Sequence, residues 1–158
     1  MAKLKILTGT DNKILRTKSV EIKHVTKIAK LIKDMKDTLD AKDLGLAAPQ
    51  VGENVRMCLI RLNPSTKSET LVFMINPKIT EMDKEKEIGE EGCLSLPGLW
   101  VNVERAKKIT VKFLDTKGKE QILMLERLNA RIIQHEVDHL DGILMVDRAV
   151  FDANAGLR

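Results

Sequence analysis

Two histidines four residues apart are the strongest chemical signal in the sequence. His135 and His139 enclose the pentapeptide His-Glu-Val-Asp-His. Residues four apart on a helix share a face, so both imidazoles can bind one metal ion. Glu136 projects beside that face, where its carboxylate can reach a water on the metal without being a ligand. The spacing therefore predicts metal-assisted hydrolysis, and the alternative is an exposed helix turn in which a histidine forms an ion pair.

A catalytic metal site of this type needs a third protein ligand and an open position for water. Cys93 is the best candidate, because it lies in the segment EGCLS at 91–95, where Gly92 allows a close backbone approach. His24 lies in lysine-rich polar sequence and is a poor candidate. Cys58 lies in an apolar run that is typical of a buried side chain. We expect both thiols to be reduced, with Cys93 available to a metal.

A third segment with chemical potential is GLAAPQVG at 45–52. Its small residues let the backbone lie close to another group, and the Gln50 amide offers an N–H that could stabilise an oxyanion. Taken alone, the segment is better explained as a tight connection between a helix and a strand, with Gln50 merely exposed.

The elements that must position these residues are predicted from the hydrophobic periodicity. Apolar residues at three- and four-residue steps predict amphipathic helices at about 24–41 and about 126–140, and the second helix carries the histidine pair. Short apolar runs bounded by turn residues predict strands at 57–62, 71–75, 109–114 and 121–125. Because the connections are too short for parallel crossovers, we expect an α+β fold with mostly antiparallel pairing.

The composition of the 158-residue chain limits the function classes further. No repeat or linker divides the sequence, so we expect a single domain over 1–158. The net charge of +4 permits an acidic partner, but three Phe, one Trp and no Tyr argue against a dedicated nucleic-acid binder. No apolar run approaches the roughly 20 residues of a membrane span, and the opening residues lack a secretion signal. We therefore expect a cytoplasmic protein.

Taken together, the three segments resemble the signature segments of the peptide deformylases, in the same order along the chain. They are GLAAPQVG at 45–52, EGCLS at 91–95 and QHEVDHLDG at 134–142. The resemblance covers nearly the whole chain. It implies an α+β fold in which mostly antiparallel β-sheets surround a central helix that carries the HExxH metal motif. It also implies removal of the formyl group from the N-terminal formyl-methionine of newly synthesised polypeptides.

The resemblance implies a metal site with the same ligands as the spacing argument. Cys93, His135 and His139 would bind one divalent metal, Fe²⁺ in the cell, for which Ni²⁺, Zn²⁺ or Co²⁺ can substitute. The expected partners are N-formylmethionyl peptides and nascent chains, with transient ribosome contact but no specific nucleic acid and no membrane.

The resemblance also implies roles for the residues around the metal. Glu136 would be the general acid and base that assists attack of a metal-bound water on the formyl carbon. Gln50 and the backbone N–H of Leu94 would stabilise the oxyanion, and Gly45 and Leu94 would contact the substrate. Formate would then be released.

Two features depart from the usual pattern of the family. Asp43 occupies a position that is usually glycine, so substrate affinity or peptide preference could differ. The alternative is that Asp43 tolerates the backbone geometry and points to solvent. The chain ends at Arg158, whereas many bacterial members have a longer basic C-terminal helix, so we do not expect ribosome docking by that route. Residues 151–158 are expected to fray.

Two other functions remain open from the sequence. The first is a broader HExxH metallopeptidase that cuts internal peptide bonds, although such enzymes more often use His or Glu as the third ligand. The second is a binding protein that resembles a deformylase but has lost turnover. Cleavage of an unformylated peptide would indicate the first function, and metal binding without formate release would indicate the second.

Overall fold

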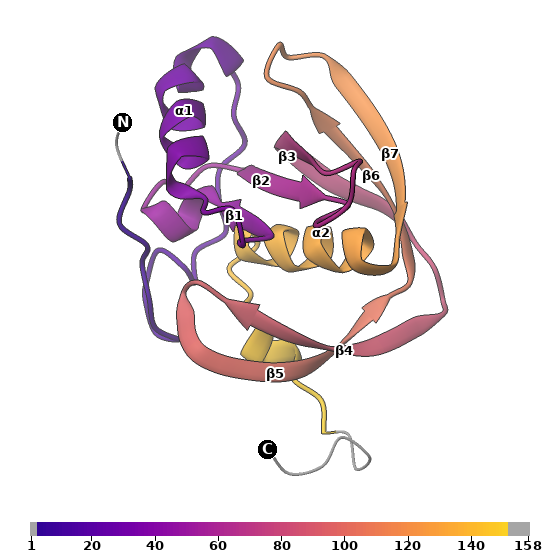
Figure 1. The fold of residues 1–158 in the computed structure, drawn as a ribbon. Helices are drawn as coiled ribbons and strands as arrows, with labels where there is room; N and C mark the ends of the chain where they lie inside the picture. The colour runs from indigo at the N-terminus through magenta and orange to yellow at the C-terminus, as the bar shows by residue number, and fades with distance from the viewer. Residues whose placement is uncertain (1–2, 152–158) are drawn as a thin grey trace.

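Helix α2 (Arg127–Leu140) lies between two antiparallel β-sheets (Figure 1). The structure, a computed structural model, describes residues 3–151. Its larger sheet has the strand order β1-β2-β3-β6-β7, and the smaller sheet pairs β4 with β5. The strands are β1 (Gly45–Ala47), β2 (Met57–Leu62), β3 (Thr70–Met82), β4 (Lys86–Cys93), β5 (Leu96–Ala106), β6 (Lys108–Leu114) and β7 (Glu120–Glu126). This arrangement confirms the predicted α+β fold.

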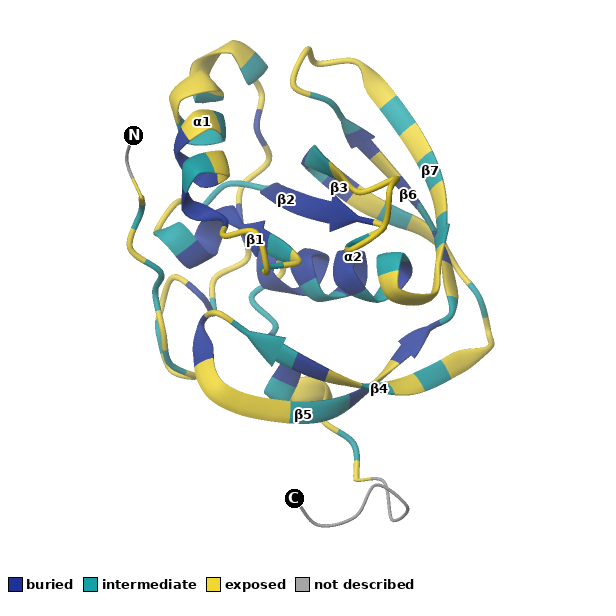
Figure 2. Ribbon diagram, viewed as in Figure 1, coloured by how far each residue is buried: buried dark blue, intermediate teal, exposed yellow. Residues whose placement is uncertain are grey.

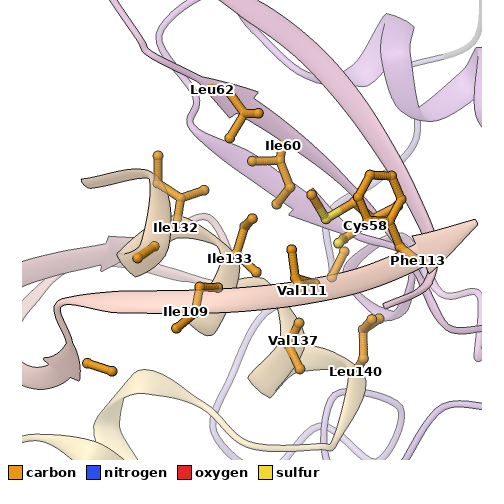
Figure 3. Packing of buried hydrophobic residues seen from close by; sticks show 14 residues of the cluster. Cys58, Ile60, Leu62, Ile109, Val111, Phe113, Ile132, Ile133, Val137 and Leu140 are labelled. Carbon is orange, nitrogen blue, oxygen red and sulfur yellow. The ribbon is translucent and has the colours of Figure 1, made fainter. Parts of the chain in front are cut away.

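The main core lies between α2 and the larger sheet. Figure 2 shows that the last turn of α2 and all of β2 are buried. Ile133 and Leu140 on the helix belong to one cluster with Cys58 and Ile60 of β2 and with Val111 of β6 (Figure 3). Because apolar residues line the helix face that meets the sheet, the remaining face of the helix is left for the histidine pair.

Gln134 fixes α2 against the end of β5. Its side-chain carbonyl accepts the N–H of Ala106 at 3.0 Å, and its amide donates to the carbonyl of Ala106 at 2.9 Å. The same amide donates to the carbonyl of Ala130 at 3.0 Å. The helix that carries the histidines is thereby tied to a strand of the smaller sheet by its own side chain.

Helix α1 (Ala29–Thr38) is shorter than the helix predicted at 24–41. Its predicted first turn is the 3₁₀ helix η1 (Val25–Ile28), and no side chain caps the start of that turn at His24. The uncapped turn tightens into i→i+3 hydrogen bonds instead. At the other end, Asp40 and Asp43 exchange hydrogen bonds that close a turn and stop the helix.

The helix predicted at 126–140 is confirmed, and each predicted strand lies within a strand of the larger sheet, although β3 extends to Met82, well beyond the predicted 71–75. Strands β1, β4 and β5 were not predicted, because the residues at 45–47 and 86–106 lack a sustained apolar alternation. The chain also turns at Leu94 and Ser95, although Pro97 and Gly98 are residue types more typical of turns. Residues 97–99 instead have no register partner in β4, because the register of β4 and β5 shifts between Gly92 and Cys93.

Two short 3₁₀ helices complete the described chain. They are η2 (Ala48–Val51), which follows β1, and η3 (Met145–Arg148), which follows α2. Of the predicted frayed tail, only the exposed Phe151 lies within the described residues. Within residues 3–151, neither helix has the length and the apolar character needed to cross a membrane.

Candidate active site

Three side chains with metal-binding atoms meet where β4 ends beside α2. One ligand atom each from Cys93, His135 and His139 lies within 4.8 Å of the others, and Cys93 Sγ is 3.3 Å from His139 Nε2. The structure thus brings the predicted third ligand next to both histidines. His24 instead lies exposed at the start of η1, and Cys58 is buried in the core, as the sequence predicts.

Local sequence explains how these three side chains come together. The four-residue spacing places the two imidazoles on one face of α2, edge to face, with ring centroids 5.0 Å apart. Cys93 is the last residue of β4 and precedes the turn to β5. A Cβ at the neighbouring Gly92 would lie 2.6 Å from the ring of Trp100. The glycine lets the tryptophan ring pack directly against the strand that presents the thiol.

Glu91 orients His135. Its buried carboxylate lies 2.8 Å from His135 Nδ1, so a proton on Nδ1 leaves Nε2 free to bind a metal. Burial alone would raise the pKa of Glu91, but hydrogen bonds from Arg105 and His135 hold it well below its usual range. Burial likewise would lower the pKa of His135, but hydrogen bonds with Cys93 and Glu91 raise it to about 10, so a metal ion that binds at Nε2 would displace a proton.

Arginines surround the carboxylate of Glu91. Arg105 donates to both of its oxygens, from Nε at 2.9 Å and from Nη2 at 2.8 Å. Arg131 adds a third hydrogen bond at 2.8 Å. Arg105 also donates to Asp138 Oδ2 at 2.5 Å. This buried network was not predicted from the sequence, although Glu91 and Asp138 both lie inside the motif segments and so gave a signal for it.

The carboxylate of Glu136 is buried against the backbone of Gly45. Only 4% of Glu136 is exposed, and a Cβ on Gly45 would lie 2.6 Å from Glu136 Oε1. Burial raises the pKa of Glu136 to about 7, despite the opposing influence of the neighbouring His135. A carboxyl group with such a pKa can accept and return a proton near neutral pH.

The residues present fit a metal ion. Two buried polar atoms, Glu136 Oε2 and His139 Nδ1, have no hydrogen-bond partner among residues 3–151. Burial, together with the charge of His135, holds the pKa of His139 well below its usual value, so this imidazole is neutral and has a lone pair available. A thiolate and two imidazoles are a donor set that suits first-row transition metals.

Gln50 is buried in η2 and points into the same site. Its side-chain carbonyl accepts the N–H of Ala47 at 2.9 Å, which fixes the orientation of the amide. The amide nitrogen then donates to Ser95 Oγ at 3.1 Å and lies 3.8 Å from Cys93 Sγ. Gln50 is therefore a positioned hydrogen-bond donor rather than an exposed residue of a connecting loop.

A pocket of about 580 Å³ opens beside the candidate ligands. Gly45, Leu94 and Gln50 line it, together with Cys93, His135 and Glu136. Its rim carries the exposed apolar side chains of Leu44, Leu94, Trp100 and Leu128. The predicted catalytic and substrate-binding residues therefore border one cavity, and the apolar rim offers a surface for an extended peptide.

Asp43 also lines this pocket, but its side chain is turned back to its own loop. The carboxylate accepts the N–H of Asp40 at 3.0 Å, and the Asp43 carbonyl accepts a hydrogen bond from Arg61 at 2.8 Å. Asp43 is not one of the described residues whose φ is positive. The position therefore does not require the conformational freedom of glycine.

Proteins of known family resemble this chain in sequence and in fold. A family model described as polypeptide deformylase matches residues 3–154. The peptide deformylase of Thermodesulfovibrio yellowstonii is 43% identical over 151 residues, which cover 94% of this chain and 90% of the relative. The crystal structure of peptide deformylase from Thermotoga maritima matches with a TM-score of 0.88 and 37% identity, covering 96% of this chain and all of that one. A peptide deformylase from Acinetobacter baumannii with Met-Ala-Ser bound matches with a TM-score of 0.82 and 35% identity, covering 92% and 97% of the two chains. The chain belongs to the peptide deformylase family.

Proposed function

We propose that the chain removes the N-formyl group from the formyl-methionine terminus of newly synthesised polypeptides and releases formate. The observation that carries this proposal is the cluster of Cys93, His135 and His139 at a pocket that the Glu136 carboxylate also lines. Family membership supports the reaction type. The expected partners are N-formylmethionyl peptides and nascent chains in the cytoplasm.

Cys93, His135 and His139 would hold one divalent metal, for which we expect Fe²⁺ in the cell and Ni²⁺, Zn²⁺ or Co²⁺ as substitutes. When bound, the metal would act as a Lewis acid and lower the pKa of a water molecule. Glu91 supports this role of His135 because its carboxylate accepts a hydrogen bond from Nδ1–H, so that Nε2 stays available as a ligand.

Glu136 is the residue suited to move the proton. Hydrolysis breaks the bond between the formyl carbon and the methionine nitrogen, the water oxygen joins the formyl carbon, and a proton must reach the departing amine. The carboxylate of Glu136 takes that proton from the water and returns it to the amine. Its Oε2 lacks a partner within the described residues, which leaves it free to accept the proton.

The remaining site residues would hold the substrate. The Gln50 amide and the backbone N–H of Leu94 stabilise the oxyanion that forms on the formyl oxygen. Gly45 and Leu94 line the pocket beside the peptide. The Met-Ala-Ser complex of the Acinetobacter baumannii deformylase supports a site that accommodates a short peptide beginning with methionine.

Formate release from formyl-Met-Ala-Ser by anaerobically purified, iron-loaded protein tests this function. We expect release from the formylated peptide and no cleavage of unformylated Met-Ala-Ser. The matched variant Glu136→Gln keeps the size of the side chain but cannot take up a proton, so it should bind metal and lose most of its turnover, by about 100-fold or more. The Cys93→Ser variant should lose metal as well as turnover.

Other results would point to the alternatives. Cleavage of internal bonds in an unformylated peptide would indicate a general metallopeptidase. A full complement of metal with no formate release would indicate a binding protein without turnover. Near-wild-type turnover of Glu136→Gln with metal bound would exclude Glu136 as the general base.

A further inference from the structure

A continuous row of ion pairs connects the candidate ligand His135 with 3₁₀ helix η3. Glu91 contacts His135 Nδ1 and receives a two-pronged hydrogen bond from Arg105. Arg105 donates a hydrogen bond to Asp138. The carboxylate of Asp138 also accepts hydrogen bonds from Arg148, from Nε at 2.6 Å and from Nη2 at 3.0 Å. Glu91, Arg105 and Asp138 are less than 8% exposed, so the row runs through the interior and ends at Arg148 in η3.

Asp138 balances two guanidinium groups. Within residues 3–151, the cations that contact its carboxylate are Arg105 and Arg148. Asp138 is buried, whereas the side chain of Arg148 is 45% exposed. Removing one cation from a buried carboxylate leaves part of its negative charge uncompensated. Arg148 therefore compensates part of the negative charge of Asp138. Arg105 can then keep its two hydrogen bonds to Glu91.

We propose that Arg148 is a positioning residue that holds His135 in its metal-binding orientation through Asp138, Arg105 and Glu91. The proposal rests on the metal-binding part of the proposed function. It does not require contact between Arg148 and the metal, the substrate or any reacting atom.

The backbone of η3 is anchored independently of the Arg148 side chain. Ala149 forms a β-bridge with Val103 of β5, and the N–H of Val150 donates to the carbonyl of Asn102 at 2.8 Å. Removing the guanidinium should therefore leave η3 in place. We expect the change to reach the ligand through Arg105, which contacts both Asp138 and Glu91.

The test compares wild type with Arg148→Ala in the release of bound Co²⁺ or Zn²⁺ to a chelator. Loss of a partner directly behind a metal ligand typically lowers metal affinity 10- to 100-fold, and Arg148 lies further from the metal. We expect metal release about 3 to 10 times faster than in wild type. The visible absorption of the Co²⁺ form should change, and kcat for a formyl-peptide should fall while KM stays near the wild-type value.

Two further variants separate positioning from general stability. Arg148→Lys retains the positive charge and should restore most of the slow metal release. Arg16→Ala removes a similar two-pronged ion pair, between Arg16 and Asp147 of the same turn, without touching the row. Arg16→Ala should lower the thermal midpoint as much as Arg148→Ala but leave the metal release rate and the Co²⁺ spectrum unchanged.

A double-mutant cycle decides whether Arg148 acts through Asp138. With Asp138→Asn the carboxylate charge is gone, so adding Arg148→Ala should change metal release by less than about twofold. The proposal is overturned if Arg148→Ala releases metal as slowly as wild type, if Arg16→Ala accelerates release equally, or if the full effect of Arg148→Ala persists with Asp138→Asn. A wild-type protein that binds metal but releases no formate would contradict the proposed function, whereas the metal-release comparison would still test Arg148.

Discussion

The missing side chain at Gly45 determines where the Glu136 carboxylate can lie. A Cβ at this position would be 2.6 Å from Oε1 and 2.9 Å from Cδ of Glu136, which is too close for any side chain. Because Glu136 is itself almost fully buried, it can give way only by moving its carboxylate within the site. The glycine is thus a condition for the position of the proposed base.

We therefore predict that Gly45→Ala lowers turnover with little effect on metal content. A displacement of about 1 Å at a reacting group can reduce a rate about 100-fold, and we expect a loss of that order in kcat. The measurement is kcat for a formyl-peptide with metal analysis of the same sample. An unchanged kcat would show that the proton is handled elsewhere, and a parallel loss of metal would show that the site as a whole was disrupted.

The residues of the site divide into those that sequence could predict and those that it could not. The ligand candidates His135 and His139, with Glu136 between them, are fixed by one turn of helix, so their spacing alone predicts their proximity. Arg105 pairs with Glu91 across 14 residues and with Asp138 across 33, and nothing local marks such a pair. These partners become visible only when the fold brings β4, β5 and α2 together.

At the scale of elements, Gln134 couples α2 to the smaller sheet. Its side chain satisfies both the N–H and the carbonyl of Ala106, and all of these groups are buried. Gln134→Leu leaves two backbone groups without partners, each of which costs about 1–3 kcal/mol when buried. We predict that this variant loses about 2–4 kcal/mol of unfolding free energy in urea denaturation.

The matched control for this prediction is Gln121→Leu in β7. Gln121 donates a hydrogen bond to the side chain of Asp115 in the hairpin loop between β6 and β7. Its loss therefore leaves no backbone group of the core without a partner. It should change the unfolding free energy by less than about 0.5 kcal/mol. Equal effects of the two variants would show that the bonds to Ala106 do not hold the helix to the sheet.

Helices and strands could be predicted from the sequence where one of their faces is apolar over several helical turns or several residue pairs of a strand. The periodicity of α2 is strong because its apolar residues pack on the larger sheet, and the prediction matches its bounds to within one residue. β4 and β5 form a two-stranded ribbon in which glutamate and glycine are frequent, and both have low strand propensity. The two strands are stabilised by their pairing with each other and by the ion pairs next to them. Neither contribution can be recognised from a local sequence pattern.

At the scale of the whole molecule, distant segments converge on one site. The N–H of Leu7 donates to the carbonyl of Gln50 at 2.7 Å, and that of Gly9 donates to the carbonyl of Ser95 at 3.0 Å. The N-terminal segment thereby joins the two motif segments that precede α2. Arg56 ties the end of α2 to the start of β2 through hydrogen bonds to the Leu140 carbonyl and to Asp141. The three motif segments are therefore held in place by contacts outside the motifs.

This arrangement predicts that metal stabilises the entire fold. Cys93 belongs to the smaller sheet, whereas His135 and His139 lie on the helix that packs against the larger one. An ion bound by all three would bridge two parts of the molecule that must separate on unfolding. At a free metal concentration 1,000 times the dissociation constant, binding adds about 4 kcal/mol to the stability of the folded state. For a chain of this size we expect the thermal midpoint to fall by roughly 8–16 °C when a chelator removes the metal.

Calorimetry with and without the chelator measures this shift, and two variants identify its origin. His139→Ala should unfold at the same temperature in both conditions, because it lacks a ligand on α2. Cys93→Ser decides whether the smaller sheet takes part, since serine is a far weaker ligand for transition metals than a thiolate. If Cys93→Ser retains the full metal-dependent shift, the metal is held by α2 alone and the two sheets are not joined through it. If the shift is lost, the ion is a structural link between them as well as the centre of the proposed chemistry.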